Sequence, residues 1–346
     1  MQTEIFKVDP TRVVDYDEMI ERAAGIIKSG GLVAFPTETV YGLGCSALDE
    51  DGAKKIYTAK GRPQDNPLIV HIADPRDAEN YAVTNEYYYK IADAFMPGPI
   101  TVILPKKDAV PYSVTGGLQT IGLRCPENAV ARALIRAAGV GIAAPSANIS
   151  GTPSPTSGVH VIKDMNGRID AIIDGGECEI GLESTIISLD GHTATILRPG
   201  AVTYDALMCV CGEVKIDKSV TGSIGENERP LSPGMKYRHY APRAPLLLAR
   251  GDDAKVIAFF REKIKTENCL ILCYTEDLTA LGNVKTLSIG GREKYGEQAH
   301  NLFAALRIAD TLDIDRIYTR LPGSDGLGLA LYNRLIRAAS HTIIDV

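Results

Sequence analysis

The sequence predicts an α/β protein of two domains, and three observations lead to this prediction. Short apolar runs alternate with amphipathic segments of helical period along most of the chain. This alternation fails over residues 217–242 and restarts after Pro242. The length of 346 residues is also enough for two domains. We therefore predict a first domain over residues 1–216, an interdomain linker over 217–242, and a smaller parallel-sheet domain over 243–346.

The elements of the first domain are bounded by residues that stop helices and strands. Gly30 and Gly31 end the first predicted helix, and the run Met96-Pro-Gly-Pro99 ends another. The predicted helices cover residues 15–29, 51–59, 86–95, 127–138 and 204–209. The predicted strands cover residues 32–35, 68–73, 100–104, 120–126, 171–174, 185–189 and 193–197.

The second domain is predicted to begin with a strand and to alternate strands with helices. Its expected order is strand 245–249, helix 253–265, strand 269–273, strand 284–288, helix 293–312, strand 315–318 and helix 327–340. This order is typical of a small parallel-sheet domain.

The composition is ordinary for a soluble globular protein, with 45% hydrophobic and 23% charged residues. A net charge of −6 disfavours a protein that coats nucleic acid, although a local basic pocket remains open. The N-terminus lacks the apolar region of a signal peptide, and no apolar run is long enough to span a bilayer. The seven cysteines form no Cys-x-x-Cys pair. We expect a cytoplasmic protein with reduced thiols, no zinc site and no membrane association.

Polar segments follow several of the predicted strands. Hydroxyl groups, one carboxylate and two glycines occupy residues 36–44, directly after the first apolar strand. Lys60 and Arg62 follow, and Pro63 favours an extended backbone in which both cations point to one side. Two cations beside hydroxyl groups suit a polyanion such as a nucleoside triphosphate, whereas solvated loop cations are the simpler alternative.

A second polar turn follows the small-residue run that begins at Gly141. Ser146 and Asn148 are two residues apart, so that their side chains can point the same way. An N-cap near Pro155 explains some of the hydroxyl groups that come next, but not all of them.

The predicted linker is rich in aromatic and cationic residues. It contains Tyr237, Arg238, His239 and Tyr240 within the run from Leu231 to Pro242. An inert linker would contain more glycine, serine or charge. We consider two interpretations, packing between the domains and a lid over the pocket of the first domain.

Three separated motifs belong together: Lys60-Gly-Arg62 with Asn66-Pro67, Ser146-Ala-Asn148, and Ser232-Pro-Gly-Met-Lys-Tyr-Arg-His-Tyr240. In this order they resemble one family, the two-domain form of the threonylcarbamoyl-AMP synthases, whose first domain is called YrdC-like. The run Gly326-Leu-Gly-Leu-Ala-Leu-Tyr-Asn-Arg334 extends the resemblance over nearly the whole chain. The resemblance implies a twisted mixed α/β sheet with a large, basic, concave cavity, followed by a smaller Rossmann-like domain.

The resemblance also implies an activity. It is the condensation of L-threonine, bicarbonate and ATP into threonylcarbamoyl-AMP and pyrophosphate, the first step in making the threonylcarbamoyl group of adenosine 37 in tRNA (t6A). A downstream threonylcarbamoyl-transferase complex is the implied partner, and no direct tRNA binding is required. Carried over position by position, the implied threonine-binding residues are Thr39, His71, Arg124, Ala144 and Ser184. The implied nucleotide-binding residues are Lys60, Arg62, Asn66, Thr120, Ser146, Asn148, Ser154, Arg198 and Tyr240, of which Lys60 and Arg62 are also the expected catalytic residues.

The chemistry of the residue types agrees with these implied roles. Arg124 offers a bidentate fork to the carboxylate of threonine, and Lys60, Arg62 and Arg198 can oppose the charges of ATP. We expect Mg²⁺ to enter with ATP, held mostly by phosphate oxygens and water, because the sequence shows no carboxylate cluster and no resident metal site. No covalent nucleophile is expected, since positioning and charge stabilisation suffice for this reaction.

Three alternatives remain open at this stage. The basic concavity could bind RNA, which the acidic net charge disfavours. The enzyme could use carbamoyl phosphate, as hydrogenase-maturation proteins with a similar domain do, but those proteins carry zinc-binding cysteine pairs that this chain lacks. The second domain could be purely structural, or it could have a regulatory or docking role.

Overall fold

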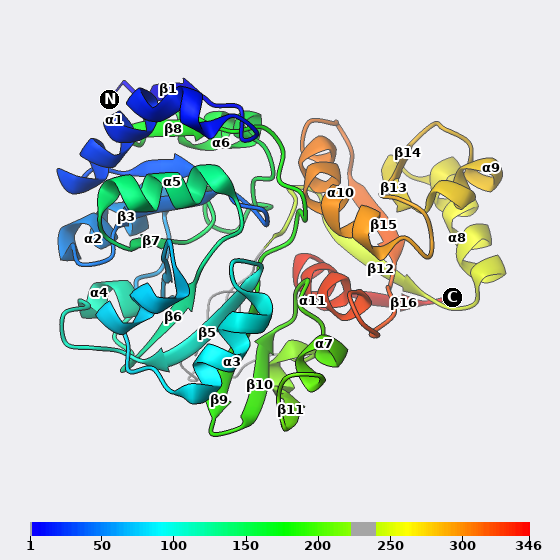
Figure 1. Cartoon of the computed structure of the whole chain (residues 1–346). Helices are drawn as coiled ribbons and strands as arrows, with labels where there is room; N and C mark the ends of the chain where they lie inside the picture. The colour runs from blue at the N-terminus through cyan, green and yellow to red at the C-terminus, as the bar shows by residue number, and fades with distance from the viewer. Residues whose placement is uncertain (1, 223–239) are drawn as a thin grey trace. The chain divides into compact units, whose positions relative to one another are not determined.

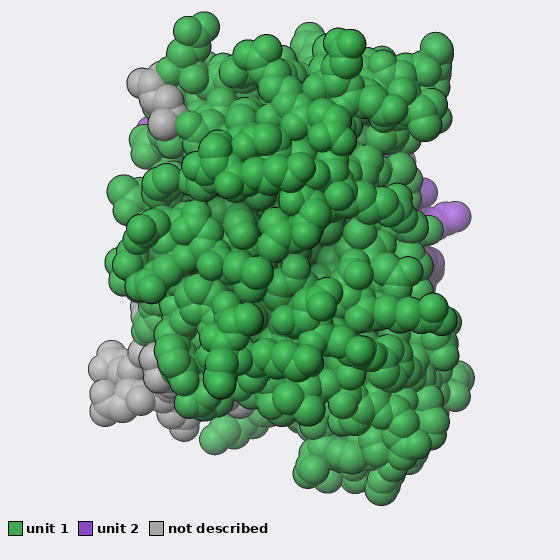
Figure 2. Space-filling model, turned by 60° about the vertical axis from the view of Figure 1, so that its left-hand side comes forward, with its two compact units in different colours: residues 1–150, 154–179, 183–236 green, residues 151–153, 180–182, 237–346 purple. Residues whose placement is uncertain are grey.

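The computed structural model describes residues 2–222 and 240–346 of the chain. These residues form two compact units, shown in different colours in Figure 2. Of the described residues, unit 1 holds 2–150, 154–179 and 183–222, and unit 2 holds 151–153, 180–182 and 240–346. Unit 2 therefore includes two short pieces of the sequence that was predicted to belong to the first domain. Most of the predicted linker, including Tyr237, Arg238 and His239, lies outside the described residues.

Unit 1 is built on a mixed sheet, which has eleven strands within the described residues (Figure 1). The strands are β1 Glu4–Lys7, β2 Val33–Phe35, β3 Gly42–Ser46, β4 Ile69–His71, β5 Ile100–Pro105, β6 Thr120–Arg124, β7 Ile142–Ala144, β8 Ala171–Asp174, β9 Thr185–Asp190, β10 Thr193–Arg198 and β11 Glu213–Ile216. Their order in the sheet is β1-β8-β2-β3-β7-β4-β6-β5-β9-β10-β11. Parallel and antiparallel pairs both occur, as β4 with β6 and β5 with β6 illustrate.

The helices of unit 1 cover the two faces of this sheet unequally. They are α1 Asp17–Lys28, α2 Glu50–Lys60, α3 Glu86–Phe95, α4 Tyr112–Thr115, α5 Ala129–Ala138, α6 Gly158–Met165 and α7 Tyr204–Met208. One face packs against α2, α3, α4, α6 and α7 in a large apolar core. On the other face, α1 and α5 pack over the half of the sheet that contains β8, β2 and β7.

Local sequence accounts for the helix ends in unit 1. The side chains of Asp49, Asn85 and Asn128 accept hydrogen bonds from the first-turn N–H groups of α2, α3 and α5. Gly61 and Gly139 take left-handed conformations just after α2 and α5. Polar capping residues at the first turn and glycines after the last turn are the residue types that favour helix ends.

Unit 2 is a doubly wound parallel sheet in the order β14-β13-β15-β12-β16. Its strands are β12 Leu246–Arg250, β13 Cys269–Cys273, β14 Thr286–Ser288, β15 Arg316–Arg320 and β16 Ile343–Asp345. Its helices are α8 Asp253–Thr266, α9 Leu278–Leu281, α10 Tyr295–Ala309 and α11 Gly328–Ala338. The predicted parallel sheet of the second domain is therefore confirmed.

The sequence prediction missed several short strands. These are β1, β3, β11 and β16. Strand β3 contains Gly42 and Gly44, which weaken a strand signal, and it pairs antiparallel with β2. None of the helices in the described parts of the chain is long and apolar enough to cross a membrane.

Candidate active site

The site of unit 1 lies on one face of the large sheet, and the strand register builds it. His71 on β4 and Arg124 on β6 are direct partners in a parallel pair, so their side chains lie on the same side. Val102 on β5 pairs with Leu123 in the antiparallel pair of β5 and β6, which brings Thr101 opposite Arg124. Three neighbouring strands thus present an imidazole, a guanidinium and a hydroxyl group to one place.

Alternation along these strands separates the site from the core. Val70, Val102 and Leu123 point to the opposite face and enter the large apolar core. On the site face, a small separate apolar cluster lies beside the polar residues and consists of Ile69, Ile186 and Leu197, with Ile103 packed against it. The site face of the sheet therefore carries charged side chains next to a small apolar surface.

Arg124 is held by the polar turn that follows β2. Its Nη1 donates a hydrogen bond to Thr39 Oγ1 at 2.8 Å. Its Nη2 lies 2.7 Å from a carboxylate oxygen of Glu38. The Thr39 hydroxyl group is in turn 2.9 Å from that of Thr37. All four side chains are buried, so the turn fixes the position of the guanidinium group.

His71 is buried next to this pair and is uncharged near neutral pH. Its Nδ1 is 3.2 Å from the carbonyl oxygen of Ile69, and its ring meets the edge of Phe35 with centroids 5.7 Å apart. Burial, and secondarily the positive charge of Arg124, lower the pKa of His71 to about 3. The imidazole can therefore serve as a hydrogen-bonding group, but it is a weak base.

Ser184 joins Arg198 to this cluster. The guanidinium group of Arg198 donates to the carbonyl oxygen of Ser184 from Nε at 3.1 Å and from Nη2 at 3.0 Å. The Ser184 hydroxyl group is 2.8 Å from that of Thr101, which faces Arg124. Thr39, His71, Arg124 and Ser184 are thus connected by contacts or by register.

Ser154 is linked to this group by a hydrogen bond to Glu183, the neighbour of Ser184 in the sequence. Its hydroxyl group donates to the carboxylate of Glu183 at 2.6 Å, and Glu183 directly precedes Ser184. Both Ser154 and Glu183 are buried.

Lys60 contacts the second polar turn, but its backbone differs from the prediction. The extended segment predicted for Lys60 and Arg62 is wrong, because Lys60 is the last residue of α2 and Gly61 follows with φ of 63°. The ammonium group of Lys60 donates to the carbonyl oxygen of Ser146, to that of Asn148 at 2.5 Å, and to Asn148 Oδ1 at 3.3 Å. Ser146 Oγ lies 2.5 Å from Asn148 Oδ1, so these two side chains do point the same way.

Arg62 folds back over its own loop. It donates from Nε to the carbonyl oxygen of Asn66 at 3.3 Å and from Nη2 to that of Pro67 at 3.1 Å. The side chain of Asn66 is buried, and its Oδ1 has no hydrogen-bond donor among the described residues. A buried amide oxygen in this condition is a candidate ligand contact.

The three remaining predicted residues lie in different surroundings. Thr120 begins β6 on the same face as Arg124, and Ala144 pairs with Ile69 across β4 and β7. Tyr240 belongs to unit 2, where its ring lies 5.1 Å from that of Phe303. Its contact with a nucleotide stays a prediction.

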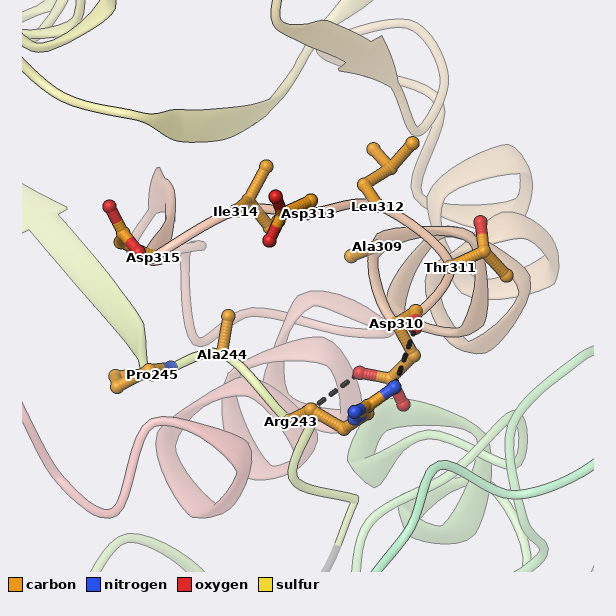
Figure 3. Close-up of a pocket in the computed structure, with 10 residues that line it drawn as sticks. All are labelled: Arg243, Ala244, Pro245, Ala309, Asp310, Thr311, Leu312, Asp313, Ile314 and Asp315. Carbon is orange, nitrogen blue, oxygen red and sulfur yellow. Dashed lines mark hydrogen bonds between the residues drawn. The ribbon is translucent and has the colours of Figure 1, made fainter.

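Unit 2 has pockets of its own, and the predicted site residues line neither of the two described next. One pocket of 590 Å³ lies where the chain enters β12 and β15, and Figure 3 shows Arg243 and Asp310 bonded across its lower side. Another of 230 Å³ lies at the carboxyl ends of the strands, the usual ligand edge of such a sheet, where Arg292 and Arg320 pair with Asp253.

Comparisons with known proteins cover both units. A family model described as "Telomere recombination" (Sua5_yciO_yrdC) matches residues 25–200, and one described as "Threonylcarbamoyl-AMP synthase, C-terminal domain" matches residues 202–340. The threonylcarbamoyl-AMP synthase of Pyrococcus abyssi is 44% identical over 348 residues, which cover 97% of this chain and 100% of that protein. The chain belongs to the threonylcarbamoyl-AMP synthase family.

Further relatives agree with this family membership. The threonylcarbamoyl-AMP synthase of Bacillus subtilis is 42% identical, over 99% of this chain and 100% of its own length. The crystal structure of P. abyssi Sua5 complexed with L-threonine has a TM-score of 0.89 and 41% identity, and the match covers 100% of both chains. The resemblance is confirmed, and so is the predicted fold class of a twisted mixed α/β sheet followed by a smaller α/β domain. The large concave cavity stays a prediction.

The structure places further residues beside the candidate site of this threonylcarbamoyl-AMP synthase family member, and the sequence did not assign them. They are Glu38 beside Arg124, Thr101 beside Ser184, and Glu183 beside Ser154. The signal for Glu38 was present, since it is a lone carboxylate between two threonines after a buried strand. Thr101 depends on strand register, which a single sequence does not reveal.

Proposed function

We propose that this chain condenses L-threonine, bicarbonate and ATP into threonylcarbamoyl-AMP and pyrophosphate, the activated intermediate for t6A formation in tRNA. The observation that carries the proposal is the connected set of Thr39, His71, Arg124 and Ser184 on one sheet face of a chain whose full-length relatives are threonylcarbamoyl-AMP synthases. The related P. abyssi Sua5 forms a complex with L-threonine, which supports the same substrate here.

In the proposed reaction, the residues bind and orient the substrates. Arg124 receives the carboxylate of threonine, Thr39 and Ser184 offer hydroxyl groups, and neutral His71 offers a hydrogen bond. Threonine's amine attacks the carbon of bicarbonate or CO₂ to give N-carboxy-threonine. The new carboxylate then attacks the α-phosphorus of ATP, and pyrophosphate leaves.

The nucleotide is assigned to the residues around the second polar turn. Lys60, Arg62 and Arg198 supply positive charge for the phosphates, and Asn66, Thr120, Ser146, Asn148 and Ser154 supply polar contacts. Mg²⁺ would enter with ATP and neutralise phosphate charge. The described residues include no group of three or more His, Cys, Asp and Glu side chains that could hold a metal ion, so phosphate oxygens and water would supply most ligands. A downstream threonylcarbamoyl-transferase complex would take the adenylate.

The test is to incubate the purified full chain with ATP, Mg²⁺, labelled bicarbonate and single amino acids, and to detect the acyl-adenylate by mass spectrometry. We expect the adenylate and pyrophosphate only with threonine. Lys60→Ala and Arg62→Ala should each abolish threonine-dependent pyrophosphate release. Lys54→Ala is the matched control, because Lys54 lies on the same helix with its side chain exposed. Activity with carbamoyl phosphate in place of threonine and bicarbonate would refute the proposal.

A further inference from the structure

Glu38 is a buried carboxylate whose hydrogen-bonding capacity is unused. Its side chain is 2% exposed, and neither carboxylate oxygen has a hydrogen-bond partner among the described residues. The 2.7 Å contact with Arg124 Nη2 brings the charges together, but its angle is too poor for a hydrogen bond. Nε and Nη2 of Arg124 also lack acceptors of good geometry there. Burial of a carboxylate without hydrogen bonds is strongly unfavourable unless another group donates hydrogen bonds to it.

The surroundings indicate which kind of group is missing. A free amino acid is a zwitterion, so its site needs a cation for the carboxylate and an anion for the ammonium group. Arg124 and Glu38 form such a pair in direct contact. The nearby Cys178 thiol does not supply the anion, because burial raises its pKa, and His71 is neutral at pH 7 because its pKa is lowered.

We propose that Glu38 binds the α-ammonium group of threonine while Arg124 binds the α-carboxylate, and that Glu38 takes the proton which this nitrogen loses on carboxylation. This inference rests on the proposed function. In the step, Glu38 removes one proton from the ammonium group, the freed lone pair forms the N–C bond with bicarbonate, the C–OH bond breaks, and the hydroxide leaves as water with a second proton from the nitrogen. Threonine ammonium and bicarbonate thus yield N-carboxy-threonine, water and one proton, which Glu38 accepts.

The binding test compares threonine with a ligand that keeps only one of its two charges. Isothermal titration calorimetry of the full chain gives the dissociation constants of L-threonine and of 3-hydroxybutyrate. The second ligand keeps the carboxylate and the hydroxyl group but lacks the amine. The wild-type protein should bind threonine at least tenfold more tightly. Glu38→Gln should weaken threonine binding by about tenfold to a hundredfold and leave 3-hydroxybutyrate binding unweakened. Glu50→Gln, on the exposed start of α2, should change neither.

Other outcomes overturn the inference in distinguishable ways. If Glu38 only orients Arg124, Glu38→Gln will weaken both ligands equally, which refutes the ammonium contact. If the wild-type protein does not bind threonine, the proposed function itself fails. If Glu38→Gln does not fold, the wild-type preference still decides, because less than a threefold preference for threonine over 3-hydroxybutyrate contradicts the inference.

The proton-transfer part has a separate readout. At saturating threonine, Glu38→Gln should lower kcat for adenylate formation at least tenfold, because an amide does not accept the proton. Glu38→Asp keeps a carboxylate and should retain more of kcat than Glu38→Gln, even if KM rises. Equal kcat values for the wild type and Glu38→Gln would exclude Glu38 as the proton acceptor.

Discussion

Lys60→Met should destabilise unit 1 strongly, because the ammonium group of Lys60 links α2 to the second polar turn. The side chain is 1% exposed, and Nζ donates to the carbonyl oxygens of Ser146 and Asn148 and to Asn148 Oδ1. Methionine has a similar length and no donor, so the variant keeps most packing and removes the hydrogen bonds that Lys60 donates. A hydrogen bond to a charged group contributes about 1.5–3 kcal/mol. Allowing for partial relaxation, we expect the free energy of unfolding to fall by about 2–5 kcal/mol.

The assay is urea denaturation followed by circular dichroism and by tyrosine fluorescence, whose agreement tests for a single unfolding step. Lys54→Met provides the control on the same helix, where the lysine side chain is 50% exposed and paired with Glu50. Exposed ion pairs contribute little, so the control should remain close to the wild type. The reasoning is refuted if Lys60→Met shifts the unfolding transition no more than Lys54→Met does.

Three further predictions follow from local features. The unfolded state should bind a proton at His71 below about pH 6.5, whereas the folded state does so only near pH 3. The free energy of unfolding should therefore fall as pH is lowered through this window. In His71→Gln, the slope of the free energy of unfolding against pH, measured by urea denaturation, should be smaller by up to ~1.4 kcal/mol per pH unit. Gly181→Ala should lower Tm more than Gly176→Ala, because both have positive φ but only at Gly181 would the added Cβ lie 2.5 Å from the His300 carbonyl oxygen; equal losses would contradict that contact. Cys209 is the exposed thiol among the seven, so a thiol reagent should label it first in the native protein, as peptide mapping can check.

The sequence predicted most helices and core strands because their signals are local. The helix predicted over residues 86–95 and the strands predicted over 171–174 and 269–273 have the same bounds in the structure. Each combines an apolar pattern of the right period with polar or breaker residues at its ends. Strand β3 was missed because its glycines resemble a turn, and only its pairing with β2 makes it a strand.

The sequence predicted which residues are candidates for the site, and their roles stay predictions, but it did not predict most of their contacts. Ser146 and Asn148 were predicted to point together from their spacing, and they do. The extended backbone expected for Lys60 was wrong, because α2 continues through Lys60 and ends at Gly61, which has a left-handed conformation. The approach of Thr39 to Arg124 spans 85 positions in the sequence, and nothing local to either residue encodes it.

The contact between Arg124 and Glu38 agrees with the zwitterionic substrate proposed for this part of the candidate site. The guanidinium group and the carboxylate lie 2.7 Å apart and are both buried, so their charges largely offset each other. A balanced pair attracts a polyanion weakly but complements a zwitterion. Threonine, rather than the phosphates of ATP, is therefore the substrate that we expect beside Arg124.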